Sequence, residues 1–318
     1  MSPPLPNPSR RRIAALPLVA LLAVLVVALA AALPAPAAAQ IVITDHEELD
    51  FERPEAWAMA WFSAVAFPTA LDAGKPLPAG AVELSLEGGW VPSLSEEQRT
   101  VGFLGEKPED LNRAPVFGRP RLAVGLPARF TATVSWAPPL EVDGVEPNVL
   151  SFSLSRPLWE SERGRFAARL FGQHGVLSGD LTCPRDIAGI ADFRVNPYGC
   201  EQPSRDEMSL RLAGVELQAS TTLARWPRLA PYAAIAGSRL HAEFQVDARR
   251  NGFLDRTLLE TDGTLWSGTV GLAVDTGTRA RLAAELFYTP LDVVGRAGKG
   301  EETDGLFNAR VLLAYRVR

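Results

Sequence analysis

The sequence predicts an all-β fold, a closed antiparallel up-and-down transmembrane β-barrel of about ten strands, with roughly eight to twelve as the range. Three observations carry this prediction. Segments that alternate apolar and polar residues recur along the chain, as in strands with two unlike faces. Short and long connections alternate between these segments, and their polar faces carry many charges. The predicted strands start near residue 81, and their number is even, as in bacterial transmembrane barrels.

Residues 1–39 have the features of a signal peptide. Three arginines, Arg10 to Arg12, precede an apolar run from Ile13 to Leu33, and Ala37 to Ala39 offer a small-residue cleavage site before Gln40. The alternative is an uncleaved membrane anchor, because about 20 apolar residues can span a bilayer. Cleavage would leave 29 basic and 37 acidic residues, and a negative net charge argues against nucleic acid as a partner.

Residues 40–80 are expected to form an N-terminal leader ahead of the barrel, which takes residues 81–318. The segment from Ala56 to Phe67 is rich in aromatic residues and is expected to form an extra strand or, after Pro54, a short helix. The acidic run from Asp45 to Asp50 is interpreted as a solvated, flexible stretch. A divalent-cation site is the alternative, although the run lacks the spacing of a calcium-binding loop.

The strands are predicted in order along the chain. The clearest alternate between an apolar and a polar face over 82–90, 130–136, 150–155, 232–247 and 307–317, and weaker matches cover 119–126, 165–178, 264–274 and 279–288. Between Met208 and Leu223 the apolar residues change parity near Ala213 and Gly214. A β-bulge at that point would explain the change.

The connections divide into two classes. Brief turns are expected near 125–128, 158–164, 225–229 and 275–278, and long polar loops at 92–117, 138–147, 179–207, 247–263 and 292–304. Cys183 and Cys200 lie 17 residues apart within one long loop. Because an exported chain meets an oxidising compartment, the two cysteines are expected to form a disulfide.

Charged and polar residues on the polar faces are expected to form a network inside the barrel. The predicted members are Glu83, Glu87, Arg121, Arg169, Arg239, His241, Glu243, Arg279, Arg281, Glu285 and Arg310. A ten-stranded barrel is little wider than an eight-stranded one, whose side chains nearly fill the interior. Paired charges would therefore plug it, which disfavours an open porin and leaves a narrow polar pore or a ligand pocket closed by loops.

The chain resembles bacterial outer-membrane β-barrel proteins as a class, through the signal peptide, the alternating strands and the terminal strand from Phe307 to Val317. No narrower family is indicated. The resemblance implies an outer-membrane location, with membrane lipid and the barrel assembly machinery as partners. The chain departs from the class at Arg318, where an aromatic residue is usual.

Enzymes occur in this class, including acyl hydrolases, lipid A modifiers and omptin-like proteases. Of the three histidines, His174 is the likeliest general base, a weak candidate because Ser178 on the same strand face would lie about 13 Å away. No pattern for a metal or a cofactor is present. A non-enzymatic barrel with a structural, loop-mediated binding or narrow-pore role is the leading hypothesis. A barrel enzyme acting on lipid or peptide, and a soluble periplasmic β-barrel or sandwich that binds a ligand, are the alternatives.

Overall fold

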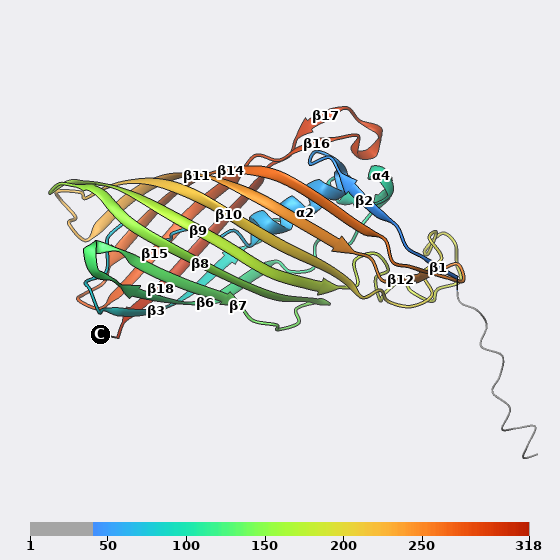
Figure 1. Ribbon diagram of the computed structural model, residues 1–318, viewed down its shortest axis with the longest axis horizontal. Coiled ribbons are helices and arrows are strands. Elements are labelled where there is room, and N and C mark those ends of the chain that lie inside the picture. Colours follow the sequence, from blue (N-terminus) through green and yellow to red (C-terminus); the bar gives the residue numbers. More distant parts are fainter. Residues whose placement is uncertain (1–40, 318) are drawn as a thin grey trace, which may run out of the picture. The chain divides into compact units, whose positions relative to one another are not determined.

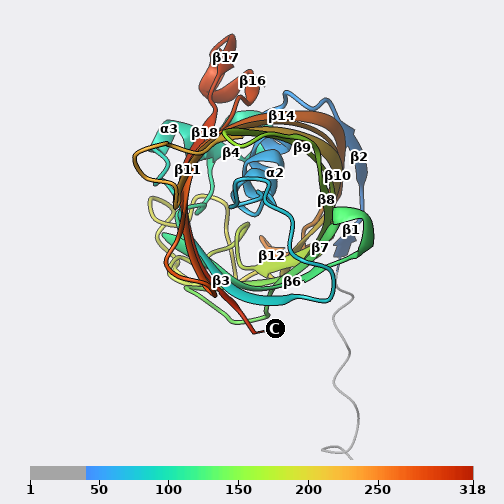
Figure 2. The same ribbon diagram turned by 90° about the vertical axis from the view of Figure 1, so that its left-hand side faces the viewer.

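The computed structural model describes residues 41–317, in which ten antiparallel strands form a closed barrel. Each strand pairs with its neighbours along the chain, and the pairings β11–β14 and β18–β3 complete the ring (Figures 1 and 2). The strands are β3 (Val82–Trp90), β6 (Val116–Gly125), β7 (Thr131–Ala137), β8 (Val145–Glu160), β9 (Gly164–Gly179), β10 (Asp206–Thr221), β11 (Leu229–Gln245), β14 (Leu258–Asp275), β15 (Ala280–Thr289) and β18 (Leu306–Arg316). The predicted fold class is confirmed.

The outer wall of the barrel is apolar. On β8, for example, Leu150 and Phe152 are exposed while Ser151 between them is buried in the lumen. Two groups of exposed aromatic residues border this apolar band, one near each end: Trp90, Trp136, Trp266 and Tyr288, then Trp159, Trp226 and Tyr315. An apolar outer face with aromatic borders and a polar interior is the arrangement of a barrel that crosses a lipid bilayer.

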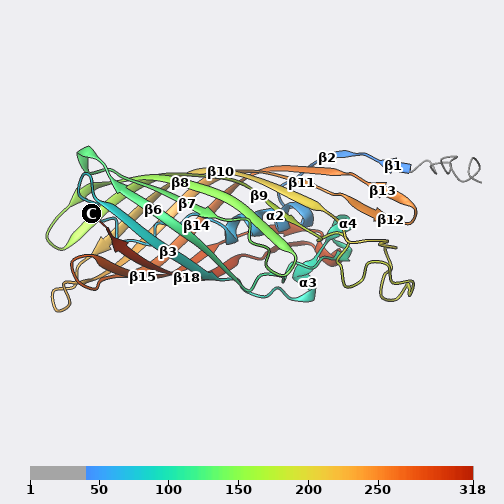
Figure 3. The ribbon, with the colours of Figure 1, turned by 90° about the horizontal axis from the view of Figure 1, so that it is seen from below.

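Most connections divide as predicted, although residues 138–144 and 222–228, one at each end of the barrel, are equally long. Residues 126–130, 161–163, 222–228 and 276–279 form turns at one end of the barrel, here called the short-turn end. The other end, the long-loop end, carries 91–115, 138–144, 180–205, 246–257 and 290–305 (Figure 3). Its loops contain α3 (Glu96–Arg99), β4 (Thr100–Val101), α4 (Gly102–Gly105), β5 (Lys107–Pro108), β12 (Ala248–Arg250), β13 (Phe253–Asp255), β16 (Asp292–Val294), η2 (Arg296–Gly298) and β17 (Glu301–Thr303), while η1 (Pro127–Arg129) lies in a turn.

The N-terminal segment passes through the barrel. It begins at the long-loop end, where β1 (Ile41–Ile43) pairs with β13 and β2 (His46–Leu49) runs parallel to β14. Helix α2 (Pro54–Val65) then lies inside the ring of strands, and the chain reaches the short-turn end before β3 (Figure 2). None of the helices in the described part of the chain is long and apolar enough to cross a membrane.

Two local predictions are corrected. The acidic run is no flexible leader, because His46 to Leu49 pair in register with Leu258 to Thr261. Strand β10 has no bulge, because its pairing with β9 and β11 continues through Ala213 and Gly214. What changes there is the surrounding of one inner face. On the lumen-facing side of β10, the half near the long-loop end packs against the apolar helix, and the half near the short-turn end meets polar groups. The cleavage site predicted before Gln40 lies outside the described residues.

Candidate functional site

Helix α2 fills the lumen near the long-loop end. Pro54 occupies its first turn, where a missing N–H costs nothing. The helix is apolar on every side, so it is stable only when other parts of the protein surround it. Its buried side chains Trp57 and Trp61 belong to the same core as Leu210 and Leu240 on the barrel wall. Trp57 also donates from Nε1 to the carbonyl of Asp304 at 3.0 Å, which fastens the helix to a long loop.

Two lumen arginines hold the C-terminal end of α2. Arg310 donates to the carbonyls of Ala64 at 3.1 Å and Val65 at 3.3 Å, and to that of Phe67. Arg119 donates to the carbonyls of Ala66 at 2.9 Å and Phe67 at 3.1 Å. The last carbonyls of a helix lack partners within the helix and carry partial negative charge. The two guanidinium groups therefore satisfy the end of the helix that points into the barrel.

Glu87 balances these arginines at the centre of the lumen. Its fully buried carboxylate accepts two hydrogen bonds from Arg119 at 2.8 Å and one from Arg121 at 3.2 Å, and Arg310 lies 3.9 Å away. Arg169 and Glu216 form a further buried ion pair, Arg281 and Glu83 form a partly buried one, and Tyr232 donates to Glu285 at 3.0 Å. Most of the charges assigned to the lumen thus lie there. Arg119 and Glu216 were missed, although both stand at inward positions of their strands.

Four of the residues assigned to the lumen lie elsewhere. Arg239, His241 and Glu243 point outward from β11, while Leu240 and Ala242 between them are fully buried. The reason is that the outer part of β11 extends beyond the apolar band. There its outward face meets water or lipid headgroups, and its inward face packs against α2. Arg279 is exposed in the turn before β15.

The chain that follows α2 occupies the rest of the lumen. Inward-pointing side chains of several strands donate to its backbone carbonyls. Arg121 bonds Ala70 at 3.1 Å, and Ala73 accepts from Arg165 at 3.2 Å and from Ser220 at 2.8 Å. These bonds run from wall side chains to a backbone without regular structure, a pattern that leaves no periodic trace in a sequence. Helix and extended segment together close the barrel interior.

A pocket of about 380 Å³ lies between α2, the inner faces of β10, β11 and β14, and the long loops. Its floor is apolar and includes Met59, Phe62, Met208, Phe244 and Leu259. Its acidic lining residues are Asp45, Glu47, Glu55, Glu109 and Asp255, against the basic residues Arg53 and Arg250. A concave apolar surface with a few convergent polar groups is the usual form of a small-molecule site.

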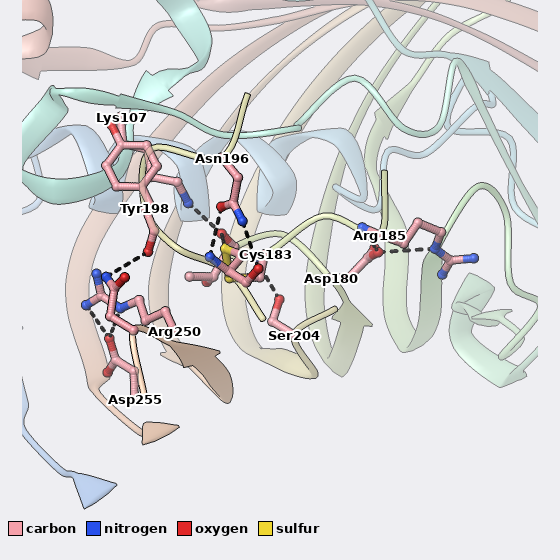
Figure 4. The surroundings of a disulfide bond; sticks show 12 residues. Lys107, Asp180, Cys183, Arg185, Asn196, Tyr198, Ser204, Arg250 and Asp255 are labelled. Carbon is pink, nitrogen blue, oxygen red and sulfur yellow. Dashed lines mark hydrogen bonds and ion pairs between the residues drawn. A yellow bond between two sulfur atoms is a disulfide. The ribbon is translucent and has the colours of Figure 1, made fainter. Parts of the chain in front are cut away.

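Three long loops close together beside the pocket, as Figure 4 shows. Lys107 donates to the carbonyl of Thr182 at 2.6 Å, and its ammonium group lies 5.1 Å from the ring centre of Tyr198, which stacks on Phe103. The predicted disulfide between Cys183 and Cys200 is present, with 5.6 Å between the Cα atoms. It braces the loop that supplies Tyr198.

Glu109 is the titratable group that burial affects most in this pocket. Its carboxylate lies 2.8 Å from Nζ of Lys107, and its side chain is mostly buried, with 14% exposed. This burial, only partly offset by Lys107, raises the pKa of Glu109 from 4.5 to about 7. With a pKa of about 7, Glu109 carries only part of a charge near neutral pH, but the other four acidic lining residues still outnumber Arg53, Arg250 and the neighbouring Lys107. The pocket therefore favours a positively charged group next to its apolar floor.

The structure places His174 on the outer face of β9, where it is exposed. It lies in register with Leu150 on one side and Arg211 on the other. Neither can orient or activate an imidazole as a carboxylate does. The other two histidines, His46 and His241, are brought together near the long-loop end by the pairing of β2, β14 and β11. No spacing in the sequence reveals that proximity.

No protein-family model and no curated protein sequence matches the chain. Similar solved structures include the translocator domain of the autotransporter NalP from Neisseria meningitidis, at 11% identity over 83% of this chain and 98% of that one, with a TM-score of 0.46. The outer-membrane protease OmpT from Escherichia coli is 9% identical over 74% and 92%, with a TM-score of 0.36. The toluene transporter TodX from Pseudomonas putida is 13% identical over 76% and 69%, with a TM-score of 0.34. The strand pairing of the chain itself establishes the closed barrel of ten antiparallel strands.

Proposed function

We propose that this protein is a non-enzymatic barrel of the bacterial outer membrane that binds a small amphipathic cation at its outward-facing mouth. The observation that carries the proposal is the pocket beside α2, with its apolar floor and acidic rim. The long-loop end is assigned to the cell exterior, because barrels of this type have short periplasmic turns and longer outer loops.

The sealed lumen supports binding over conduction. Helix α2 and the chain after it occupy the interior, and buried arginines hold them by hydrogen bonds. The same helix supplies Met59 and Phe62 to the pocket floor. A ligand therefore binds to the outer side of the structure that closes the barrel. Loops on a rigid scaffold are where binding sites concentrate.

The ligand class follows from size and charge. A cavity of about 380 Å³ holds a molecule with a compact apolar body. Arg53 bonds Glu47 and Glu55, and Arg250 bonds Asp255, so both basic residues of the lining are already paired. Unpaired acidic charge remains, which attracts a cation and repels an anion.

The test compares three ligands of equal chain length: octyltrimethylammonium, octyl sulfate and octanol. The purified, refolded protein is heated with each one below its micelle-forming concentration, and the barrel is followed by its heat-modifiable migration on a gel. Ligands that bind the folded state raise the melting temperature. The cation is expected to raise it most and octyl sulfate least.

Ala58→Phe places a ring in the pocket and is expected to remove the effect of the cation, because Ala58 lines it. Ala191→Phe adds the same ring to an exposed loop position outside the pocket and serves as the control. Equal stabilisation of the wild type and Ala58→Phe by the cation would contradict the proposal. Glu109→Gln, which keeps the shape of the side chain, should lower the preference for the cation over octanol.

A further inference from the structure

The outer wall near the long-loop end carries three glutamates in one row across three strands. Glu243 on β11 pairs in register with Glu260 on β14, and Glu260 pairs in register with Glu48 on β2. All three point away from the lumen, since their chain neighbours Phe244, Leu259 and Leu49 face inward. Like charges directly opposite one another destabilise a sheet. A cation in this place would offset that repulsion.

Two histidines adjoin this row. His46 Nε2 lies 3.1 Å from Oε2 of Glu260. His241 Nδ1 lies 3.3 Å from Oδ2 of Asp262 and 3.8 Å from Oε1 of Glu260. The ligand atoms of His241, Glu260 and Asp262 are all within 4.8 Å of one another. Neighbouring ligand atoms around a tetrahedral zinc ion lie about 3.3 Å apart, since the bonds are about 2.0–2.1 Å long.

Glu243 fixes the orientation of one imidazole. Nε2 of His241 lies 2.9 Å from Oε1 of Glu243, and Nδ1 faces the carboxylates of Asp262 and Glu260. With an ion bound, Nε2 would donate to Glu243 and Nδ1 would present its lone pair to the ion. A ring nitrogen held by a carboxylate while the other nitrogen binds the ion is the usual arrangement of metal-ligating histidines. Arg211, in register with His241 on β10, forms no ion pair with these carboxylates in the described residues.

We propose that His241, Glu260 and Asp262, whose ligand atoms lie together, form with His46, which contacts Glu260, a binding site for one divalent transition-metal ion of the zinc type, with Glu243 as the positioning residue. The two imidazoles distinguish this site from a calcium or magnesium site, because those ions prefer oxygen ligands throughout. The bound ion would join β2 of the N-terminal segment to β11 and β14 of the barrel wall. This metal site does not depend on the pocket beside α2 or on the ligand proposed for it.

The test measures binding of Co²⁺ and Zn²⁺ to the chelator-treated, refolded protein by calorimetry, with Mg²⁺ and Ca²⁺ as competitors. One ion per chain is expected, with Co²⁺ giving the visible absorption of a four-coordinate site. His46→Ala and His241→Ala should each weaken binding at least about tenfold. His174→Ala is the matched control, because this third histidine lies on the same outer wall away from the cluster.

Heat-modifiable migration shows that each variant is folded. Glu243→Gln retains the ligands but weakens the hold on His241, so binding is expected to fall by about 10–100-fold. Undiminished binding by His241→Ala or His46→Ala would overturn the site as drawn, and equal binding of Ca²⁺ would overturn the metal class. The ion should also slow proteolysis between residues 41 and 53 in the wild type and not in His46→Ala.

Discussion

At the scale of the residue, the lumen shows how a buried arginine is used. Arg310 is almost completely buried, and its guanidinium lies among Glu87, the end of α2 and the ring of Phe287, whose centre is 4.6 Å away. A buried charge is costly unless every donor finds a partner. The backbone carbonyls of α2 supply partners that the barrel wall alone lacks. The helix and the arginine therefore depend on each other.

Arg310→Met is expected to lower the free energy of unfolding by about 3–5 kcal/mol, because it leaves carbonyls of α2 without their donor and removes one positive charge from beside Glu87. Urea unfolding in lipid vesicles, followed by tryptophan fluorescence, measures the change. Arg279→Met is the control, since this arginine is exposed in a turn. Its effect should remain within about 0.5 kcal/mol. Equal effects of the two substitutions would remove the role assigned to Arg310.

The pKa of Glu109 makes stability depend on pH. Burial raises it from 4.5 to about 7, so the folded state holds the proton more tightly than the unfolded state. The contribution is fully present below pH 4.5 and is lost as the pH rises through 7. The difference corresponds to about 3 kcal/mol. The free energy of unfolding should therefore fall between pH 4.5 and 7 in the wild type, and Glu109→Gln should flatten this slope. Parallel profiles would refute the assignment.

At the scale of the element, period two predicted the barrel strands because each separates two unlike environments. The rule misplaced Arg239, His241 and Glu243, because beyond the apolar band the environments exchange and the polar face turns outward. A short helix after Pro54 is one of two predicted alternatives, but the position of α2 inside the lumen could not be predicted, for another reason. The helix is apolar all round, and the groups that hold it bond to its backbone. The site between β2, β11 and β14 depends on strand pairing that links residues about 200 positions apart.

The disulfide belongs to one loop, and its loss should remain local. Cys183→Ser with Cys200→Ser removes the constraint on the loop of residues 180–205, worth about 2–4 kcal/mol to that segment. Limited proteolysis should then cut this loop faster, whereas the heat-modifiable migration of the barrel should be unchanged. Wild-type protein treated with a reductant should behave like the double variant. A barrel that no longer shifts on heating would show that the loop supports the whole fold.

At the scale of the whole molecule, the path of the N-terminal segment fixes a topology. Ile41 lies at the long-loop end, and Val82 begins β3 at the short-turn end beside Arg316 (Figure 1). An epitope tag inserted after Thr44, between β1 and β2, should be accessible to antibody on intact cells. A tag in the turn of residues 222–228 should require permeabilised cells. The reverse result would invert the orientation.

The lumen segment also determines whether the barrel conducts. The wild type is expected to show no conductance in planar bilayers, because residues 54–81 fill the interior. A chain that lacks residues 41–79 should open a narrow pore, since a ten-stranded barrel is far narrower than a porin. Its wall keeps seven inward arginines, Arg119, Arg121, Arg165, Arg169, Arg281, Arg310 and Arg316, against six inward carboxylates, Glu83, Glu87, Asp206, Glu216, Asp275 and Glu285, an excess of one positive charge. The pore should therefore prefer anions, which reversal potentials in a salt gradient would measure. The shortened chain could shift on heating like a folded barrel and still carry no current. In that case the wall side chains alone close the lumen, and the N-terminal segment is not what seals it.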